Sequence, residues 1–161
     1  MKSCGFTGHR RIEQNHWGAI RPLLARAVRY AYSEGCRDFY NGGAIGFDLL
    51  AAEAVLDLKR IYPDVRLIMV LPCMNQDSRW SESDRDKYER VVNSADKVIC
   101  LSPIYYNGCM QARNRRIVEE SDMLIAYLGR PQGGTAQTVR LAESHGLTVY
   151  NLFPTLERGE R

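Results

Sequence analysis

The chain has 161 residues, of which 45% are hydrophobic and 25% are charged, the balance of an ordinary globular protein. This composition excludes a disordered, collagen-like or coiled-coil chain, and no apolar run approaches the ~20 residues of a membrane span. The length suits a single domain. A net charge of +3 argues against a protein whose main task is to grip long nucleic acid. We therefore expect neither a long nucleic acid nor a membrane as a partner.

The cysteine and histidine positions argue against a metal site. The five cysteines form no C-x-x-C pair, and the three histidines do not have zinc-ligand spacing. We interpret the cysteines as small buried or strand-end thiols in a reducing compartment. The first residues show no signal-peptide pattern, so we expect a cytoplasmic protein with no metal and no other cofactor.

Hydrophobic periodicity predicts strands and helices that alternate along the chain. A first strand at 2–6 leads to a helix that ends at Gly35 and, because of Pro22, begins near Ile20 or is kinked there. The later elements are strand 38–40, helix 47–60, strand 65–71, helix 81–94, strand 97–101, helix 110–120, strand 123–128, helix 135–145 and strand 147–152.

This alternation predicts right-handed βαβ units and a parallel sheet covered by helices. The expected fold class is α/β: a single Rossmann-like three-layer domain over residues 1–152, with a mostly parallel sheet of about six strands. Residues 153–161 are expected to form a frayed C-terminal tail. In such folds ligands bind outside the carboxyl ends of the strands, so functional residues should directly follow strands.

Two of the strand-end loops lie early in the chain. Thr7-Gly8-His9-Arg10 offers a hydroxyl, a glycine that a ligand can approach closely and a guanidinium suited to phosphate, although a tight turn with solvated basic residues is the alternative. Gly42, Gly43 and Gly46 precede Asp48 at a helix start, a spacing that is neither a Rossmann nor a Walker A motif. Asp48 can accept hydrogen bonds from ribose hydroxyls or simply complement the helix dipole.

A further glycine-rich loop precedes the helix at 135–145. Gly133 and Gly134 present free N–H groups, and Thr135 can cap the helix or hydrogen-bond a phosphate oxygen. An ordinary capped loop is the alternative here. Two such loops at strand carboxyl ends, together with Thr7-Gly8, favour a nucleotide-like ligand. We expect the phosphate on this turn and the nucleoside end toward Gly46 and Asp48.

The loops after the third and fourth strands are harder to interpret. Pro72 ends the third strand, and the residues that follow suit either a ligand rim or a subunit contact: Arg79, Trp80, Arg85 and Tyr88. Arg113 and Arg116 share a helix face, for which a solvated basic surface is the usual explanation. Asn114 between them also allows a mixed base-and-phosphate contact.

In this order, the motifs resemble those of the YpsA-like branch of the SLOG superfamily, named after the Smf/DprA proteins and the LOG enzymes. The landmarks cover most of the chain: Thr7-Gly8-His9-Arg10, Gly42–Glu53, Pro72–Arg85, Gly108–Arg115 and Gly133–Ala136. The resemblance implies a Rossmann-like fold whose loops bind nucleotides or nucleotide-derived ligands, with Gly46 and Asp48 at ligand-binding positions. LOG enzymes hydrolyse an N-glycosidic bond with a glutamate, and Thr138 stands at that place in this chain.

The resulting hypothesis is a cytoplasmic binding protein or sensor for a nucleotide or nucleotide-derived ligand, expected to form a homodimer or higher homo-oligomer. No catalytic residue is assigned. One alternative is an enzyme that hydrolyses or transfers at an N-glycosidic bond of a nucleoside or nucleotide, LOG-like or deoxyribosyltransferase-like, with Asp48 or Glu53 as its acid. Another is a protein-interaction module. The predicted ligand-binding residues are Thr7, Gly8, His9, Arg10, Gly42, Gly43, Gly46, Asp48, Pro72, Arg113, Asn114, Gly133, Gly134 and Thr135.

Overall fold

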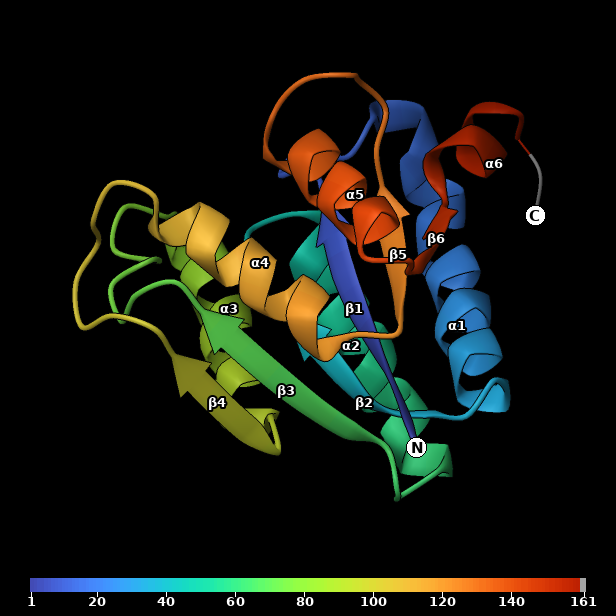
Figure 1. Cartoon of the computed structure of the whole chain (residues 1–161), viewed down its shortest axis with the longest axis horizontal. Coiled ribbons are helices and arrows are strands. Elements are labelled where there is room, and N and C mark those ends of the chain that lie inside the picture. Colours follow the sequence, from blue (N-terminus) through green and yellow to red (C-terminus); the bar gives the residue numbers. More distant parts are fainter. Residues whose placement is uncertain (160–161) are drawn as a thin grey trace.

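A six-stranded sheet runs through the middle of the molecule in a computed structural model that describes residues 1–159 (Figure 1). All of its strand pairs are parallel. The strands are β1 (Lys2–Gly8), β2 (Cys36–Asn41), β3 (Arg66–Leu71), β4 (Lys97–Cys100), β5 (Met123–Tyr127) and β6 (Thr148–Asn151). They lie in the order β4-β3-β2-β1-β5-β6.

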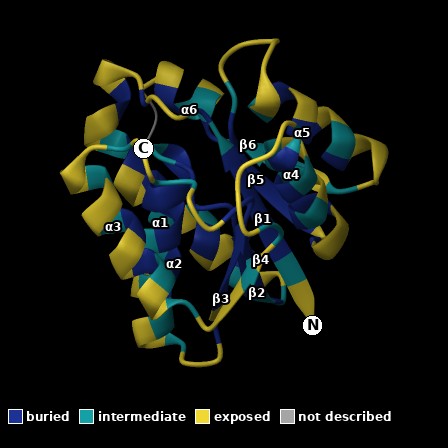
Figure 2. Cartoon of the chain, turned by 90° about the vertical axis from the view of Figure 1, so that its left-hand side faces the viewer, coloured by how far each residue is buried: buried dark blue, intermediate teal, exposed yellow. Residues whose placement is uncertain are grey.

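Helices cover both faces of this sheet, which makes three layers and confirms the predicted Rossmann-like α/β fold (Figure 1). The main core lies between the sheet and α1–α3, and two smaller apolar clusters lie beneath α4 and α5. Figure 2 shows the buried residues concentrated in the strands and on the inward sides of the helices. The helices are α1 (Trp17–Ser33), α2 (Phe47–Ile61), α3 (Glu82–Ser94), α4 (Cys109–Glu120), α5 (Gly134–Ser144) and α6 (Phe153–Glu157), and a 3-10 turn spans Gln14–His16.

The strand order reverses beside β1. The chain proceeds from β1 outward through β2, β3 and β4, and then returns to add β5 on the opposite side of β1. The loops after β1 and β5 therefore diverge toward opposite faces and leave a crevice between them, the usual ligand position in this class of fold.

Helix α1 begins earlier than the sequence predicts. It starts at Trp17 and contains Pro22, which had pointed to a start or kink near Ile20. A proline at this position lacks the N–H that would bond to the Gly18 carbonyl, and Gly18 is exposed. Water can satisfy that carbonyl, so the first turn persists ahead of the proline.

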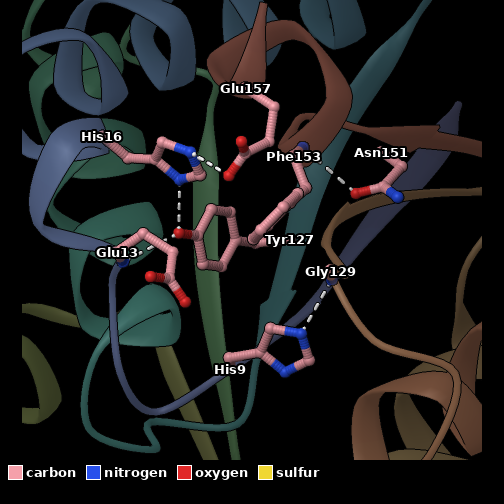
Figure 3. Close-up of polar contacts among 8 residues, drawn as sticks. All are labelled: His9, Glu13, His16, Tyr127, Gly129, Asn151, Phe153 and Glu157. Carbon is pink, nitrogen blue, oxygen red and sulfur yellow. Dashed lines mark hydrogen bonds and ion pairs between the residues drawn. The ribbon is translucent and has the colours of Figure 1, made fainter.

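The prediction of a frayed tail is wrong for the described part of residues 153–161. Helix α6 occupies Phe153–Glu157, Leu156 is 4% exposed in the main core, and the Phe153 ring lies 5.0 Å from that of Tyr127. Figure 3 shows the Glu157 carboxylate beside His16, with Oε1 2.9 Å from Nε2. A five-residue helix is too short to produce a readable hydrophobic period. Residues 160–161 lie outside the described part.

No helix within residues 1–159 is long and apolar enough to cross a membrane.

Candidate functional site

A cavity of about 310 Å³ lies at the carboxyl edge of the sheet, where the strand order reverses. We call it the central cavity. Its walls come from the end of β1, from the loops after β1, β2 and β5, from the first turns of α2 and α5, and from the first two turns of α4. The lining residues are Thr7, Gly8, His9, Arg10, Arg11, Ala44, Asp48, Met110, Arg113, Asn114, Arg130, Gln132, Gly133, Gly134 and Thr135.

Most of the predicted ligand-binding residues line this cavity, but Gly42, Gly43, Gly46 and Pro72 do not. Gly46 has φ +84°, and a Cβ there would lie 2.1 Å from the Arg10 carbonyl oxygen. A Cβ at Gly42 would lie 2.5 Å from the Arg113 guanidinium. These two glycines let the loop after β2 pack against the loop after β1 and against α4, so the structure places them behind the cavity wall.

Asp48 is a buried carboxylate with one oxygen unpartnered. Its Oδ2 accepts the Ala44 N–H at 3.3 Å, whereas Oδ1 has no hydrogen-bond partner among the described residues. Burial raises the pKa of Asp48 to about 6, and the nearby Arg113 guanidinium limits that rise. Because an unpartnered buried acceptor is costly, Oδ1 is suited to a ligand group that donates a hydrogen bond.

Arg113 is held rigidly at the back of the same cavity. Its Nη1 donates to the Gly42 carbonyl at 2.6 Å, and its Nε donates to the Asn114 side chain at 2.7 Å. Burial lowers the pKa of Arg113, and the neighbouring Asp48 opposes that change. A guanidinium fixed in this way offers a positive charge without further loss of side-chain freedom on binding.

The first turn of α5 supplies backbone donors to the cavity. The N–H groups of its first turn have no partner within the helix, and they carry the positive end of the helix dipole. A Cβ built on Gly134 would meet nothing closer than the Asn114 amide nitrogen at 4.0 Å, so Gly134 is not required for packing. This open space leaves the turn accessible to an anion.

The charge of the lining favours an anionic ligand. Four arginines line the cavity against a single carboxylate, that of Asp48. Two of them, Arg11 and Arg130, were not among the predicted site residues. Arg11 directly follows the Thr7-Gly8-His9-Arg10 motif and Arg130 lies three residues before Gly133, and this proximity was the signal that could have identified them.

His9 fixes the position of the loop after β5. Figure 3 shows its ring directed at Gly129, whose N–H donates to Nε2 at 2.8 Å. This contact needs a neutral ring, and burial together with Arg130 lowers the pKa of His9. The ring also packs edge-on against Tyr127 and Phe153. His9 therefore lines the cavity as a positioning residue.

A second cavity of about 700 Å³ adjoins the first, and we call it the outer cavity. Arg79 and Trp80 line it, while Tyr88 lies under the Trp80 ring at 5.1 Å in an edge-to-face contact. Arg85 instead faces Asp77, with Nε 3.9 Å from Oδ2. The full lining is Arg10, Ile45, Cys73, Asn75, Gln76, Ser78, Arg79, Trp80, Tyr105 and Met110.

The second carboxylate considered from the sequence lies elsewhere. Glu53 faces α1, where Arg21 Nη1 lies 3.4 Å from its Oε2, and it does not line the central cavity. Thr138 is buried, and its hydroxyl donates to the Gly134 carbonyl at 2.7 Å within α5. Asp48 is therefore the one carboxylate among the described lining residues of the central cavity.

Two curated bacterial proteins are similar in sequence to this chain. A UPF0398 protein of Halalkalibacterium halodurans is 31% identical over 144 residues, which cover 84% of this chain and 76% of that protein. A UPF0398 protein of Bacillus cereus is 27% identical over 148 residues, covering 86% and 80% respectively.

Solved structures of DNA processing protein A show the same fold. The Helicobacter pylori protein, which binds single-stranded DNA, aligns with a TM-score of 0.64 and 22% identity over 98% of this chain and 73% of its own. The Streptococcus pneumoniae protein aligns with a TM-score of 0.64 and 17% identity over 92% of this chain and 49% of its own. The sequence profile of the YpsA family, described as the YspA SLOG family, matches residues 6–150, and the chain therefore belongs to that family.

Proposed function

We propose that this protein binds a nucleotide or nucleotide-derived ligand in the central cavity, as a cytoplasmic binding protein or sensor. The observation that carries the proposal is the unpartnered, buried Oδ1 of Asp48 in the same cavity as the open first turn of α5. Asp48 Oδ1 needs a hydrogen-bond donor, and the first turn of α5 attracts an anion. A sugar phosphate supplies both, through its hydroxyl groups and its phosphate.

The expected orientation follows from charge. The phosphate lies on Gly133-Gly134-Thr135, where the helix dipole and the surrounding arginines favour an anion. The ribose hydroxyls lie at Asp48, because its carboxylate repels phosphate and accepts hydrogen bonds from neutral hydroxyls. Arg113 moderates the negative charge of Asp48 from behind.

Thermal melting with AMP, ADP, ADP-ribose and inorganic phosphate tests the binding. A ligand at a hundred times its dissociation constant should add ~2.7 kcal/mol to the free energy of unfolding. Gly134→Asp should abolish this stabilisation, because it adds a negative charge where the phosphate lies.

Gly18→Asp is the matched control, since Gly18 also lies in the first turn of a helix with open space around it. The control variant should fold and bind as the wild type does. Normal nucleotide binding by Gly134→Asp, or no melting shift with any of these compounds at millimolar concentration, would contradict the proposal.

Asp48→Ala tests the orientation. This variant should bind nucleotides more weakly but retain binding of inorganic phosphate, because the α5 turn is intact. Circular dichroism first establishes that the variant is folded. Loss of phosphate binding as complete as in Gly134→Asp would show that the phosphate lies at Asp48 instead.

One observation favours a second candidate, an enzyme acting at an N-glycosidic bond. A carboxyl with a pKa of about 6 suits acid or base catalysis near neutral pH. Incubation with AMP distinguishes the two functions. Release of free adenine that disappears in Asp48→Asn would establish the enzyme, whereas intact AMP after long incubation supports a binding protein.

We also propose a small-molecule ligand rather than a long nucleic acid, and a homo-oligomeric state. The net charge of +3 supports the first point, although one structural neighbour of the same fold binds single-stranded DNA. Titration with a fluorescent oligodeoxynucleotide at physiological salt should show no tight binding.

Light scattering measures the oligomeric state, and a monomer in solution would contradict the proposed homo-oligomer. The five cysteines, all free thiols in the structure, support a reducing, cytoplasmic location.

A further inference from the structure

We propose that the outer cavity is the base-binding compartment of the ligand site and that Trp80 and Tyr105 form its stacking surface. This inference rests on the proposed function and extends it. The ligand class becomes a nucleotide whose phosphate and ribose occupy the central cavity and whose base lies beyond them.

The two cavities are contiguous. Arg10 and Met110 line both of them. In the loop after β2, Ala44 lines the central cavity and its neighbour Ile45 lines the outer one. The Cα atoms of these two neighbouring residues lie about 3.8 Å apart, so the linings of the two cavities meet within this loop. A base attached to a ribose at Asp48 would therefore extend into the outer cavity.

The outer cavity contains aromatic surface of the kind that stacks on bases. The indole of Trp80 is half-buried and braced edge-on by Tyr88, so its orientation is fixed. Tyr105 comes from the loop between β4 and α4 and is 56% exposed. Base–aromatic stacking contributes about 1–3 kcal/mol per base, and every base has a face on which to stack.

Exposed apolar residues lie on the two loops that contribute to this cavity. Met74, Ile104 and Tyr105 are large and exposed, and they lie on the loops that follow β3 and β4. These loops are joined where the Met74 N–H donates to the Ser102 carbonyl at 3.2 Å. Clustered apolar exposure of this kind marks a binding surface, and an aromatic ring in the cavity would cover part of it.

Side-chain amides are available to read the edge of a base. Gln76 donates through Nε2 to the Gly42 carbonyl at 3.2 Å and to the Tyr88 hydroxyl at 3.3 Å. Both contacts use the amide nitrogen, which fixes the amide plane and leaves Oε1 without a partner among the described residues. Asn75 also lines the cavity. No carboxylate among residues 1–159 lines this cavity, which suits a neutral base.

The test compares AMP with ribose 5-phosphate, two ligands that share the ribose and phosphate and differ at C1, where AMP carries the base and ribose 5-phosphate a hydroxyl. Tyr105→Ala should weaken AMP binding about ten- to hundred-fold and leave ribose 5-phosphate binding unchanged. Tyr106→Ala is the matched control, because Tyr106 is a neighbouring exposed tyrosine that does not line the cavity. Equal effects of the two substitutions, or equal losses for the two ligands, would overturn the inference.

A fluorescence measurement avoids any effect of Trp80 substitution on folding. Trp17, at the start of α1, is the other tryptophan of the chain and does not line the outer cavity. In Trp17→Phe, Trp80 becomes the only indole, and AMP should change its emission while ribose 5-phosphate does not. Unchanged emission at saturating AMP would overturn the base assignment.

Failure of this inference is distinguishable from failure of the proposed function. If the wild type binds AMP and ribose 5-phosphate equally well and Gly134→Asp abolishes both, the central cavity is a sugar-phosphate site and the outer cavity takes no base. If the wild type binds neither compound, both the proposed function and the inference are wrong.

Discussion

Replacement of Asp48 by asparagine should stabilise the ligand-free protein at neutral pH. The Asp48 side chain is buried, its Oδ1 has no partner, and its pKa is raised from an ordinary value of 3.8 to about 6. A carboxyl with a raised pKa favours its protonated form in the folded state. The stability that it contributes is therefore complete below pH 3.8 and is lost as the pH rises through about 6.

The magnitude follows from the size of the pKa change. A rise of about two units corresponds to roughly 3 kcal/mol lost once the carboxyl is ionised, at pH 7 and above. Asparagine is neutral at every pH and can keep an acceptor for the Ala44 N–H. Its amide nitrogen lacks a partner, and about 1–2 kcal/mol of the gain is lost there. The net stabilisation expected at pH 7.5 is about 1–2 kcal/mol, or roughly 2–8 °C in melting temperature.

Melting curves of the wild type and Asp48→Asn between pH 4 and pH 8 measure this difference. The advantage of the variant should be largest above pH 7 and should disappear near pH 4, where both side chains are neutral. Asp57→Asn is the control, because the Asp57 side chain is exposed and its replacement should change little. A difference that does not depend on pH, or a variant that is least stable relative to wild type above pH 7, would refute the reasoning.

Three further substitutions test other contacts. His9→Ala removes the acceptor of the Gly129 N–H, so hydrogen exchange in the loop after β5 should accelerate. Because the pKa of His9 is lowered, its stabilising contribution is complete above pH 6.5 and is lost as the pH falls through the folded-state pKa. Equal protection of this loop in the wild type at pH 5 and pH 7.5 would contradict this reasoning. Gly8→Ala places a Cβ 2.3 Å from the Phe47 ring and should cost about 1–3 kcal/mol in urea unfolding, whereas a neutral result would mean that the ring moves freely. Leu156→Ala should cost about 2–5 kcal/mol, and no change would show that α6 contributes no packing.

The α/β class could be read from the sequence because it depends on local patterns. The apolar runs of β3 and β5 and the one-sided periodicity of the intervening helices alternate regularly, and the handedness of βαβ units then leaves few arrangements. The glycine loops could also be placed at the carboxyl edge of the sheet from local patterns, because each of them directly follows a predicted strand. The resemblance of the motifs to the SLOG superfamily rested on those same loops.

The two candidate acids, Asp48 and Glu53, lie on different sides of α2. This follows from helical geometry, although the sequence analysis did not use it. Asp48 and Glu53 are five residues apart on α2, which at 3.6 residues per turn places them about 140° apart around the helix. Asp48 consequently faces the central cavity, whereas Glu53 faces α1 and Arg21.

Other features depended on contacts between distant parts of the chain. Pairing of β5 with β1 brings Arg11 and Arg130 to one cavity, and no local pattern encodes that pairing. The raised pKa of Asp48 depends on burial by several elements, and the order of α6 depends on the core that receives Leu156. The sequence by itself determined which loops reach the edge of the sheet. Only the tertiary structure decided which side chains meet there, because strand order and burial arise from long-range packing.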